Sequence, residues 1–488
     1  MITITAPPDD IGSAALAAAA RMTVERLGGD GDGCALTVRL LVDDIRSRSV
    51  TGVDEGDVTL RIDSVGTEAV LSLRDGGAPI QTEPSTLHPL INLGIITGSS
   101  VSTDGHANVT VVRMALQSHS RVFDHSDEEV IDAHAPASTV ETTIRELTPA
   151  DAAGLTTLMY RCYGWSYPNT DIYFPDRIAA QIDDGSRIGE AAFAPDGQMV
   201  AHWGAVRYGP FVVESGTTAT DPRFRHRGLA DQLGQRLLVL LTDMGVIGRF
   251  REPVLTHPAT QGIALKEGAT MVGLRVNCGR AIAQTGITDG LQDHRSSLTV
   301  AYAALRELPA APVYVPDAYR AILTDVLTET NWQRPITAPD PAAGIPAETV
   351  SATTYDATNA SAVVEITVVG ADLIDEVDAS LDRARRSGAK YTEVRLPTGQ
   401  PALAIVGAGL FDLGLAYAAF LPLLRADSDV LALQWLDDPQ PDTSDWHYAD
   451  ERVERFATAV LANISEAADR AIRARRSAAG GELRRMVW

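Results

Sequence analysis

The spacing of apolar residues divides the first 125 residues into two helices followed by three strands. Helical spacing runs through DIGSAALAAAARMTVERL (10–27) and ALTVRLLVDDIRSRS (35–49). Apolar residues alternate in DVTLRIDSV (57–65) and EAVLSLRD (68–75), and HANVTVVRMAL (106–116) predicts a later strand. Because helices are segregated from consecutive strands, we expect a two-layer α/β sandwich over residues 1–124.

A change of composition follows this first region. Residues 125–140 are acidic, then small and proline-containing, which predicts a linker. A second domain is expected over residues 141–286, with one helix around the stretch ATDPRFRHRGLADQL (219–233) and another in TQGIALKEG. The strands expected in it are TTIREL, EAAFAP, MVAHWGAV, GTTATD and PVLTH.

The third region, residues 287–488, contains the proline-rich interruption PITAPDPAAGIP. After it come SAVVEITVV, ADLIDEVDASLDRARRSG and YTEVRLP, a strand–helix–strand order. Near the C-terminus a stripe of apolar residues at helical spacing predicts a helix that packs on the body of the protein. This stripe consists of Val453, Phe456, Ala457, Val460, Leu461 and Ile464.

One segment is apolar and long enough to span a bilayer, PALAIVGAGLFDLGLAYAAFLPLL (401–424). Glycines, Asp412 and Pro422 interrupt it, so we predict buried strands and turns there and no membrane span.

Composition and charge narrow the function classes. The chain has 488 residues, 45% of them hydrophobic, and a net charge of −23, which argues against a nucleic-acid-coating protein. Three widely spaced cysteines, Cys34, Cys162 and Cys278, suggest neither a disulfide framework nor a zinc site, and we predict no metal site. The start of the chain, MITITAPPDD, shows no secretory signal, so we expect a cytoplasmic protein.

The stretch ATDPRFRHRGLADQL (219–233) combines arginines and a glycine at a strand-to-helix turn. After Gly228, apolar residues recur at helical steps up to Gly245. The first N–H groups of such a helix lack intrahelical partners and carry the positive end of its dipole, which suits a diphosphate. Gly228 allows close approach, and arginines add charge-assisted hydrogen bonds. The alternative is an ordinary helix start with solvated arginines.

This turn resembles the acyl-CoA site of the GNAT superfamily of N-acyltransferases. The resemblance covers about 140 residues, with Thr217–Pro222 at the family's bulged fourth strand and THPATQGIALKEGA (256–269) at its fifth strand and next helix. It implies a mixed sheet with splayed strands four and five, and acetyl-CoA or another acyl-CoA as donor. By position, Thr218 and Thr220 would contact the pantetheine arm. The diphosphate would contact Arg225, His226, Arg227, Gly228, Leu229 and Ala230.

The same resemblance implies a general base and a general acid. Glu214, just before strand four, stands where such bases often lie, although it could also end a strand in solvent. The family's tyrosine after strand five is missing from TQGIALKEGA, so Tyr163 and Tyr167 are the candidates for the acid, with pocket lining or core packing as their other roles. His202 and His257 are expected to be structural.

The stretch LSLRDGGAP (71–79) resembles the first glycine box of the histidine-kinase-like ATPases of the anti-sigma-factor type. The resemblance implies that Asp75, with Gly77, contacts an adenine nucleotide. The family's magnesium-binding Glu and Asn are not reproduced, since Asp44 and Arg48 stand at that spacing. We therefore expect a degenerate domain that binds ATP or ADP without hydrolysing it, or that serves as a docking surface. An ordinary Gly-Pro turn is the alternative interpretation of this stretch.

The third region resembles the back half of a GNAT domain, in which a Gly-rich turn precedes a final strand pair. It lacks an Arg-x-x-Gly-x-Ala turn, so we expect a degenerate GNAT-like domain with a terminal helix and no donor site.

Together these resemblances predict a bacterial acyltransferase that moves an acetyl or other acyl group from CoA to an amine by direct attack. The acceptor would be a small-molecule amine or a protein amine, without nucleic acid or membrane, and a homodimer is one open option. Two alternatives stay open: a non-catalytic protein that senses nucleotide and acyl-CoA, and a transferase that uses an aminoacyl-tRNA donor.

Overall fold

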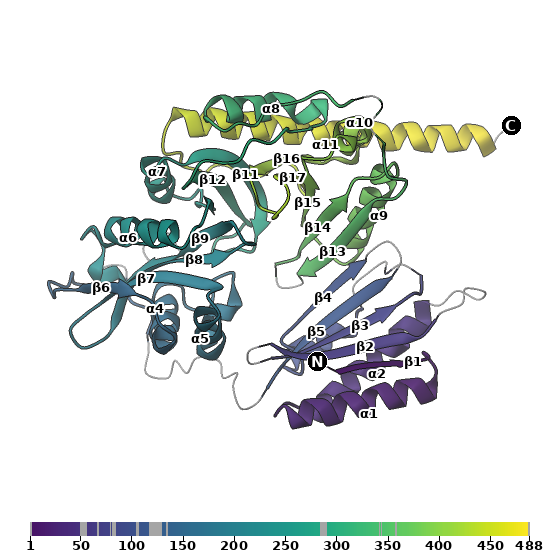
Figure 1. The fold of residues 1–488 in the computed structure, drawn as a ribbon, viewed down its shortest axis with the longest axis horizontal. Helices are drawn as coiled ribbons and strands as arrows, with labels where there is room; N and C mark the ends of the chain where they lie inside the picture. The colour runs from purple at the N-terminus through teal and green to yellow at the C-terminus, as the bar shows by residue number, and fades with distance from the viewer. Residues whose placement is uncertain are drawn as a thin grey trace.

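The computed structural model shows a mixed α/β multidomain protein with two separate sheets (Figure 1). It describes residues 2–486, except 49–55, 66–67, 79, 81–83, 104–106, 117–128, 133–134, 284–289, 341, 343 and 357–358. The predicted boundary at residue 286 and the start of the predicted linker therefore lie outside the described residues.

The N-terminal sheet has five antiparallel strands in the order β1-β2-β3-β5-β4, covered on one face by two helices (Figure 1). The predicted two-layer arrangement is confirmed, while the ATPase relationship stays a prediction. Edge strand β1 was not predicted, since its alternating residues sit at the very start of the chain. The elements are β1 (Ile2–Ala6), α1 (Asp10–Arg26), α2 (Gly31–Arg48), β2 (Val58–Val65), β3 (Glu68–Asp75), α3 (Leu87–Asn92), β4 (Gly98–Thr103) and β5 (Asn108–Ala115).

The second sheet has twelve strands, β13-β14-β15-β17-β16-β11-β12-β10-β9-β8-β7-β6. The strands from residues 143–304, called the central half because they come from the central part of the sequence, are β6 (Thr143–Glu146), β7 (Arg187–Phe193), β8 (Met199–Arg207), β9 (Val212–Thr220), β10 (Gly248–Arg251), β11 (Thr270–Gly279) and β12 (Ser296–Ala304). Those of its C-terminal half are β13 (Val350–Asp356), β14 (Ser361–Val368), β15 (Tyr391–Pro397), β16 (Ala416–Leu421) and β17 (Val430–Leu436).

Helices lie on both faces of this sheet (Figure 1). The core on one face of β7–β9 includes α6, and the core on the other face includes α4 and α5. The helices are α4 (Ala152–Tyr163), α5 (Pro175–Asp183), α6 (Leu229–Asp243), α7 (Ala259–Lys266), α8 (Asp317–Thr328), α9 (Leu373–Arg386), α10 (Ala402–Val406) and α11 (Glu451–Met486), with 3-10 turns η1 (Pro149–Asp151), η2 (Thr170–Tyr173), η3 (Pro222–Phe224) and η4 (Gly407–Leu413).

The two halves of the large sheet repeat one pattern. In β8-β9-β10-β12-β11 and in β13-β14-β15-β17-β16 the second and third strands are parallel, and the other neighbours are antiparallel. Because β12 lies between β10 and β11, this pattern runs past the predicted boundary at residue 286. On this basis we propose that the central unit extends to about β12.

A narrow seam joins the halves. Gly273 of β11 pairs with Ala419 of β16, and a Cβ on Gly273 would lie 2.5 Å from the Ala418 oxygen, so only glycine fits. The fully buried Gln434 donates to the carbonyls of Leu274 and Tyr417, both at 2.8 Å, and so links both halves.

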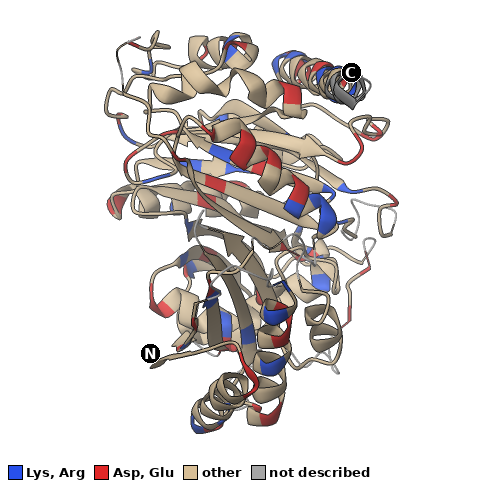
Figure 2. Ribbon diagram, turned by 90° about the vertical axis from the view of Figure 1, so that its right-hand side faces the viewer, with Lys and Arg blue, Asp and Glu red and all other residues tan. Residues whose placement is uncertain are grey.

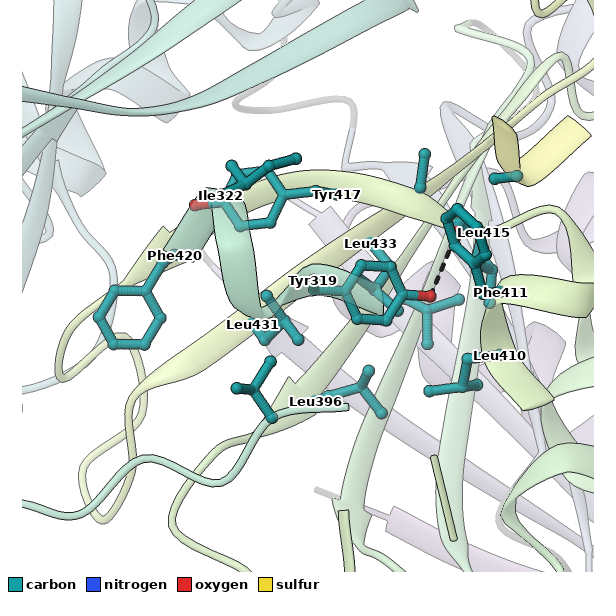
Figure 3. Packing of buried hydrophobic residues seen from close by; sticks show 14 of the residues in the cluster. Tyr319, Ile322, Leu396, Leu410, Phe411, Leu415, Tyr417, Phe420, Leu431 and Leu433 are labelled. Atoms are coloured by element: carbon teal, nitrogen blue, oxygen red, sulfur yellow. Dashed lines mark hydrogen bonds between the residues drawn. The ribbon is translucent and has the colours of Figure 1, made fainter. Parts of the chain in front are cut away.

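The largest hydrophobic core packs against the C-terminal half of the sheet. Figure 3 shows Tyr319, Phe411 and Leu415 packed together, with the Tyr319 hydroxyl donating to the Leu415 oxygen at 2.9 Å. The predicted helical stripe is confirmed, because Val453, Ala457, Val460 and Ile464 of α11 are all buried.

The apolar segment 401–424 contains the buried strand β16, as predicted, but its first part forms the helix α10 and the 3-10 helix η4 where strands and turns were expected. In the part of the chain that the structure describes, no helix is long and apolar enough to cross a membrane. The predicted strand PVLTH (253–257) is wrong: β10 pairs with β9 only as far as Phe250 and ends at Arg251, and residues 253–257 form a loop with one isolated bridge. Pro253 cannot donate a ladder hydrogen bond, which favours this early end.

Two charged contacts tie the N-terminal sheet to the rest. Arg177 of α5 pairs with Glu68 of β3 at 2.8 Å, and Arg383 of α9 donates to the Thr103 hydroxyl of β4 at 3.0 Å. Acidic and basic residues are interspersed over the molecule (Figure 2). α9 begins with acidic residues and ends with arginines, which suits the helix dipole.

Candidate functional site

Strands β9 and β10 separate in the middle of the central half. Their parallel pairing consists of Gly248 with Val212, Arg249 with Val213, and Phe250 with Glu214. Because β9 continues to Thr220 while β10 ends at Arg251, the second half of β9 has no strand partner on that side among the described residues. Such a gap exposes backbone groups that an extended ligand can bind.

A bulge shapes β9 next to this gap. Between the pairs His202 with Ala219 and Gly204 with Gly216, β9 has two residues where β8 has one. Thr217, at the bulge, has a φ of 52°, which is unusual for a β-branched residue. The expected bulged strand is therefore present.

His202 of the neighbouring strand β8 forms a hydrogen bond to the bulge. Its Nδ1 lies 2.8 Å from the Thr217 oxygen, and its ring fits between Gly189 and Gly204, where an added Cβ would approach it to 2.7 Å. Burial lowers the pKa of His202 to about 4, so the ring is neutral at pH 7 and donates from Nδ1. These contacts agree with the structural role expected for His202.

Glu214 marks the point where the strands separate. Its side chain is half-buried. Burial raises the pKa of Glu214, and the charges of Arg275, Arg187 and Arg395 oppose that rise. A carboxyl group with a raised pKa and access to solvent is suited to general base catalysis near neutral pH.

Tyr163 and Tyr167 lie over the bulge. The Tyr163 hydroxyl donates to the Thr218 oxygen at 3.5 Å, and the two rings are 5.0 Å apart, edge to face. Burial raises the pKa of both phenols, and Glu214 adds to the rise for Tyr167. The structure thus brings Tyr163 and Tyr167 to the same part of β9 as Glu214, with both phenols protonated at pH 7.

The sequence did not single out Arg187, which belongs to this cluster. Arg187 is buried in β7 and is the register partner of Val206 in β8. Val206 is also the register partner of Glu214 in β9, so Arg187 and Glu214 lie at the same level of the sheet. The Nη1 of Arg187 lies 3.4 Å from the Thr217 hydroxyl, and its charge acts on Glu214 and Tyr167. An arginine at the start of a mainly apolar strand, which also contains Glu190, was the available signal.

The strand-to-helix turn places an open helix N-terminus beside the gap. Gly228 adopts a left-handed conformation (φ 69°), precedes the first residue of α6, and has no side-chain capping bond. A Cβ on Gly228 would meet only Gln232, at 3.9 Å. His226 and Gly228 are exposed, Leu229 is buried, and Ala230 is half-buried. The helix mouth is thus accessible for an anion.

The arginines of the turn already contact the protein. Arg225 Nε donates to the Thr220 oxygen at 3.3 Å, and Arg227 donates to the carbonyls of Ser138 (3.3 Å) and Val140 (2.7 Å). These carbonyl contacts hold the two guanidinium groups beside the helix mouth.

In the C-terminal half, side chains contact the backbone beyond the equivalent separation of strands. Pairing of β14 with β15 ends at Glu365 and Arg395. Beyond it, Gln400 bonds to the Thr367 oxygen and the Val369 N–H, both at 2.8 Å, and Arg425 bonds to the Ile366 oxygen at 3.2 Å. Side chains therefore bond to the backbone beyond the separation of β14 and β15, as Tyr163 and Arg225 do at Thr218 and Thr220 of β9. The lack of a donor site in the C-terminal half stays a prediction.

The proposed adenine contact in the N-terminal domain is not supported. The Asp75 carboxylate accepts bonds from Arg48 (3.1 and 3.3 Å), Asn108 (2.9 Å) and the Gly77 N–H (3.1 Å). These protein donors give Asp75 a structural role in closing the turn. Over the described ranges, no group of three or more metal-ligating side chains is found.

Comparisons with known proteins gave structural likenesses only. No family model and no curated protein matches the chain. The chain is similar to an N-acetyltransferase from Staphylococcus aureus (16% identity, TM-score 0.29), covering 34% of this chain and 99% of that one. It is also similar to the ribosomal-protein-S18-alanine N-acetyltransferase of Escherichia coli (16% identity, TM-score 0.28), covering 35% of this chain and 97% of that one. A third similar structure is a GNAT phosphinothricin acetyltransferase of Sinorhizobium meliloti in complex with acetyl-CoA (16% identity, TM-score 0.27), covering 33% of this chain and 88% of that one.

Proposed function

We propose that this protein is an acyl-CoA-dependent N-acyltransferase. The observation that carries the proposal is the separation of β9 from β10 after Glu214 and Phe250, beside the uncapped start of α6. An extended thioester with a charged end needs both features: free strand edges for its arm and backbone N–H groups for its diphosphate.

In this proposal the donor lies along the second half of β9. The backbone of Thr218 and Thr220 contacts the pantetheine arm, and the mouth of α6, from Arg225 to Ala230, holds the diphosphate. Arg225 and Arg227 contribute charge from fixed positions, so little side-chain freedom is lost on binding. The thioester then reaches the point where the strands separate, next to Glu214.

Transfer takes place at Glu214. The carboxylate accepts a proton from the acceptor ammonium or amine, and the amine nitrogen forms a bond to the thioester carbon. The carbon–sulfur bond then breaks, and the leaving thiolate takes a proton from Tyr163 or Tyr167. Both phenols hold their protons at neutral pH because burial raises their pKa.

The donor site is tested with two glycines that flank one helix. Gly228 at the start of α6 and Gly245 just past its end are both left-handed and have open space around them. Gly228→Glu places a carboxylate at the helix mouth and should weaken acetyl-CoA binding by at least about tenfold, whereas Gly245→Glu should not. Equal acetyl-CoA affinity of the two variants, measured by calorimetry on the full chain, would contradict the site.

Turnover separates catalysis from sensing. Acetyl-CoA is incubated with a panel of amines, and free CoA thiol is measured. A transferase releases CoA only when an accepted amine is present. Tight acetyl-CoA binding with no CoA release for any amine would instead favour the regulatory alternative, in which the protein senses acyl-CoA.

A further inference from the structure

A cavity of about 360 Å³ lies where the two halves of the large sheet meet. The turn between β8 and β9 forms one wall with Arg207 and Tyr208. The other wall consists of Glu365 of β14, Arg395 of β15 and Arg425 of the β16–β17 loop. Its volume is in the range of small-molecule pockets.

The cavity is close to Glu214. Tyr208 N–H bonds to the Val212 oxygen at 2.8 Å, which places the cavity wall two residues, or roughly 7 Å, before Glu214 along β9. The Tyr208 ring packs against Phe250, the register partner of Glu214, at 5.4 Å, and Arg395 donates to the Tyr208 hydroxyl at 3.4 Å.

Three of the side chains that line the cavity are arginines and one is a carboxylate, Glu365. Arg425 pairs with Glu365 at 3.2 Å and with Asp427, just outside the lining, at 3.5 Å. Arg395 is balanced by the buried Glu393 at 2.7 Å. Arg207 Nε donates to the Gly185 carbonyl at 3.1 Å, and within the described residues it forms no ion pair. An anion in the cavity would therefore meet the uncompensated charge of Arg207, with Arg425 on the opposite wall able to donate further hydrogen bonds.

The cavity and the helix mouth lie at opposite ends of β9. Residues 207–209 precede the strand, and Gly228 follows it. The strand has nine residues and is roughly 30 Å long, with Glu214 between its two ends. A donor bound at the helix mouth therefore leaves the cavity free for a second molecule.

We infer that the cavity binds the anionic group of the acyl acceptor, a carboxylate or a phosphate, so that the substrate is an amine that also carries a negative charge. This inference rests on the proposed transferase function. Arg425 and Arg207 bind the anion, and the amine then lies toward Glu214. Arg395, fixed by Glu393 and Tyr208, shapes the wall between them.

The experiment compares matched amines with the full-length protein and acetyl-CoA. α-Amino acids are set against their carboxamides, and phosphoethanolamine against ethanolamine, so the two pairs distinguish a carboxylate from a phosphate. We expect the charged member of one pair to be used in preference. Arg425→Gln should raise its KM by about 10- to 100-fold with no change in acetyl-CoA affinity, and Arg425→Lys should restore most of it.

Two further variants complete the experiment, one as a replacement for Arg425→Gln and one as a control. Arg207→Gln is expected to act in the same direction, and it replaces Arg425→Gln should that variant unfold in a thermal melt. Arg306→Gln removes an exposed arginine that also contacts a carbonyl, that of Thr242, and should behave as wild type.

The outcomes keep this inference apart from the proposed function. Equal use of charged and uncharged amines, or an unchanged KM in Arg425→Gln and Arg207→Gln, overturns the anion site while CoA release still supports the transferase. Failure of the wild-type protein to bind acetyl-CoA overturns the transferase and the acceptor site with it.

Discussion

Arg275 of β11 and Glu393 of β15 form a buried ion pair across the two halves of the large sheet, with Nε and Oε2 2.7 Å apart. Glu393 also accepts from Arg395 at 2.7 Å and from the Tyr391 hydroxyl at 3.2 Å, and Arg275 also pairs with Glu252. Although burial opposes its charge, these arginines keep the pKa of Glu393 below its ordinary value. The Glu393 carboxylate thus links the two halves of the sheet through Arg275 and holds Arg395 in the cavity wall.

Glu393→Gln should therefore destabilise the protein strongly, because it removes the buried carboxylate that Arg275 and Arg395 share and leaves Arg275 with Glu252 and Arg395 with the more distant Glu365. We expect a loss of about 3–5 kcal/mol in the free energy of unfolding, measured by urea denaturation. Asp437→Asn, which breaks an exposed pair with Lys390, is the control and should cost less than about 1 kcal/mol. Equal effects of the two substitutions would show that the buried pair does not hold the seam.

The seam should also be sensitive to one methyl group. Gly273→Ala places a Cβ 2.5 Å from both the Ala418 oxygen and the Ala419 Cβ, so β11 and β16 must move apart. We expect a loss of about 1–3 kcal/mol and a lower melting temperature. Gly262→Ala in α7, where a Cβ meets nothing within 4 Å, should be neutral or slightly stabilising.

Stability should fall in mild acid because of His202. Its pKa is about 4 in the folded state, below its ordinary 6.5, so the folded protein resists protonation of this ring. The stabilisation is complete above pH 6.5 and is lost as the pH falls toward 4, by about 2 kcal/mol between pH 7 and pH 5. Urea denaturation at both pH values should show this loss in the wild type. A variant with His202→Asn, which cannot titrate, should show a smaller loss; the same pH dependence in both proteins would exclude His202 as its source.

Catalysis should depend on the ionisation of Glu214. Because burial raises its pKa, kcat/KM should fall as the pH drops through a value above the ordinary 4.5 of a glutamate. Glu214→Gln should lower kcat by about 100-fold or more and remove this acidic limb, while acetyl-CoA affinity is kept. A normal kcat in Glu214→Gln would assign the base to another group.

The acid can be identified by single-atom changes. Tyr163→Phe and Tyr167→Phe each remove one hydroxyl and keep the ring that packs at 5.0 Å from its neighbour. We expect one of them to lower kcat by about 10- to 100-fold with little change in stability, and the other to have a small effect. Wild-type kcat in both would leave the thiolate to be protonated by water.

Local pattern determined much of the fold. The helices α1 and α6, the strands β2, β3, β14 and β15, and the buried stripe of α11 follow from apolar periodicity, because each buries one face. The turn at Gly228 also followed from local chemistry, since a left-handed residue before an amphipathic helix favours glycine.

Only the tertiary structure decided how these pieces meet. Sequence spacing does not reveal that β12 lies in the sheet between β10 and β11. Nor does it reveal that the Asp75 carboxylate accepts hydrogen bonds from Arg48 and Asn108. It also does not bring Arg207 and Arg425 to one cavity. These relationships join residues far apart along the chain, and their energies come from burial and from charges that meet only after the sheets have formed.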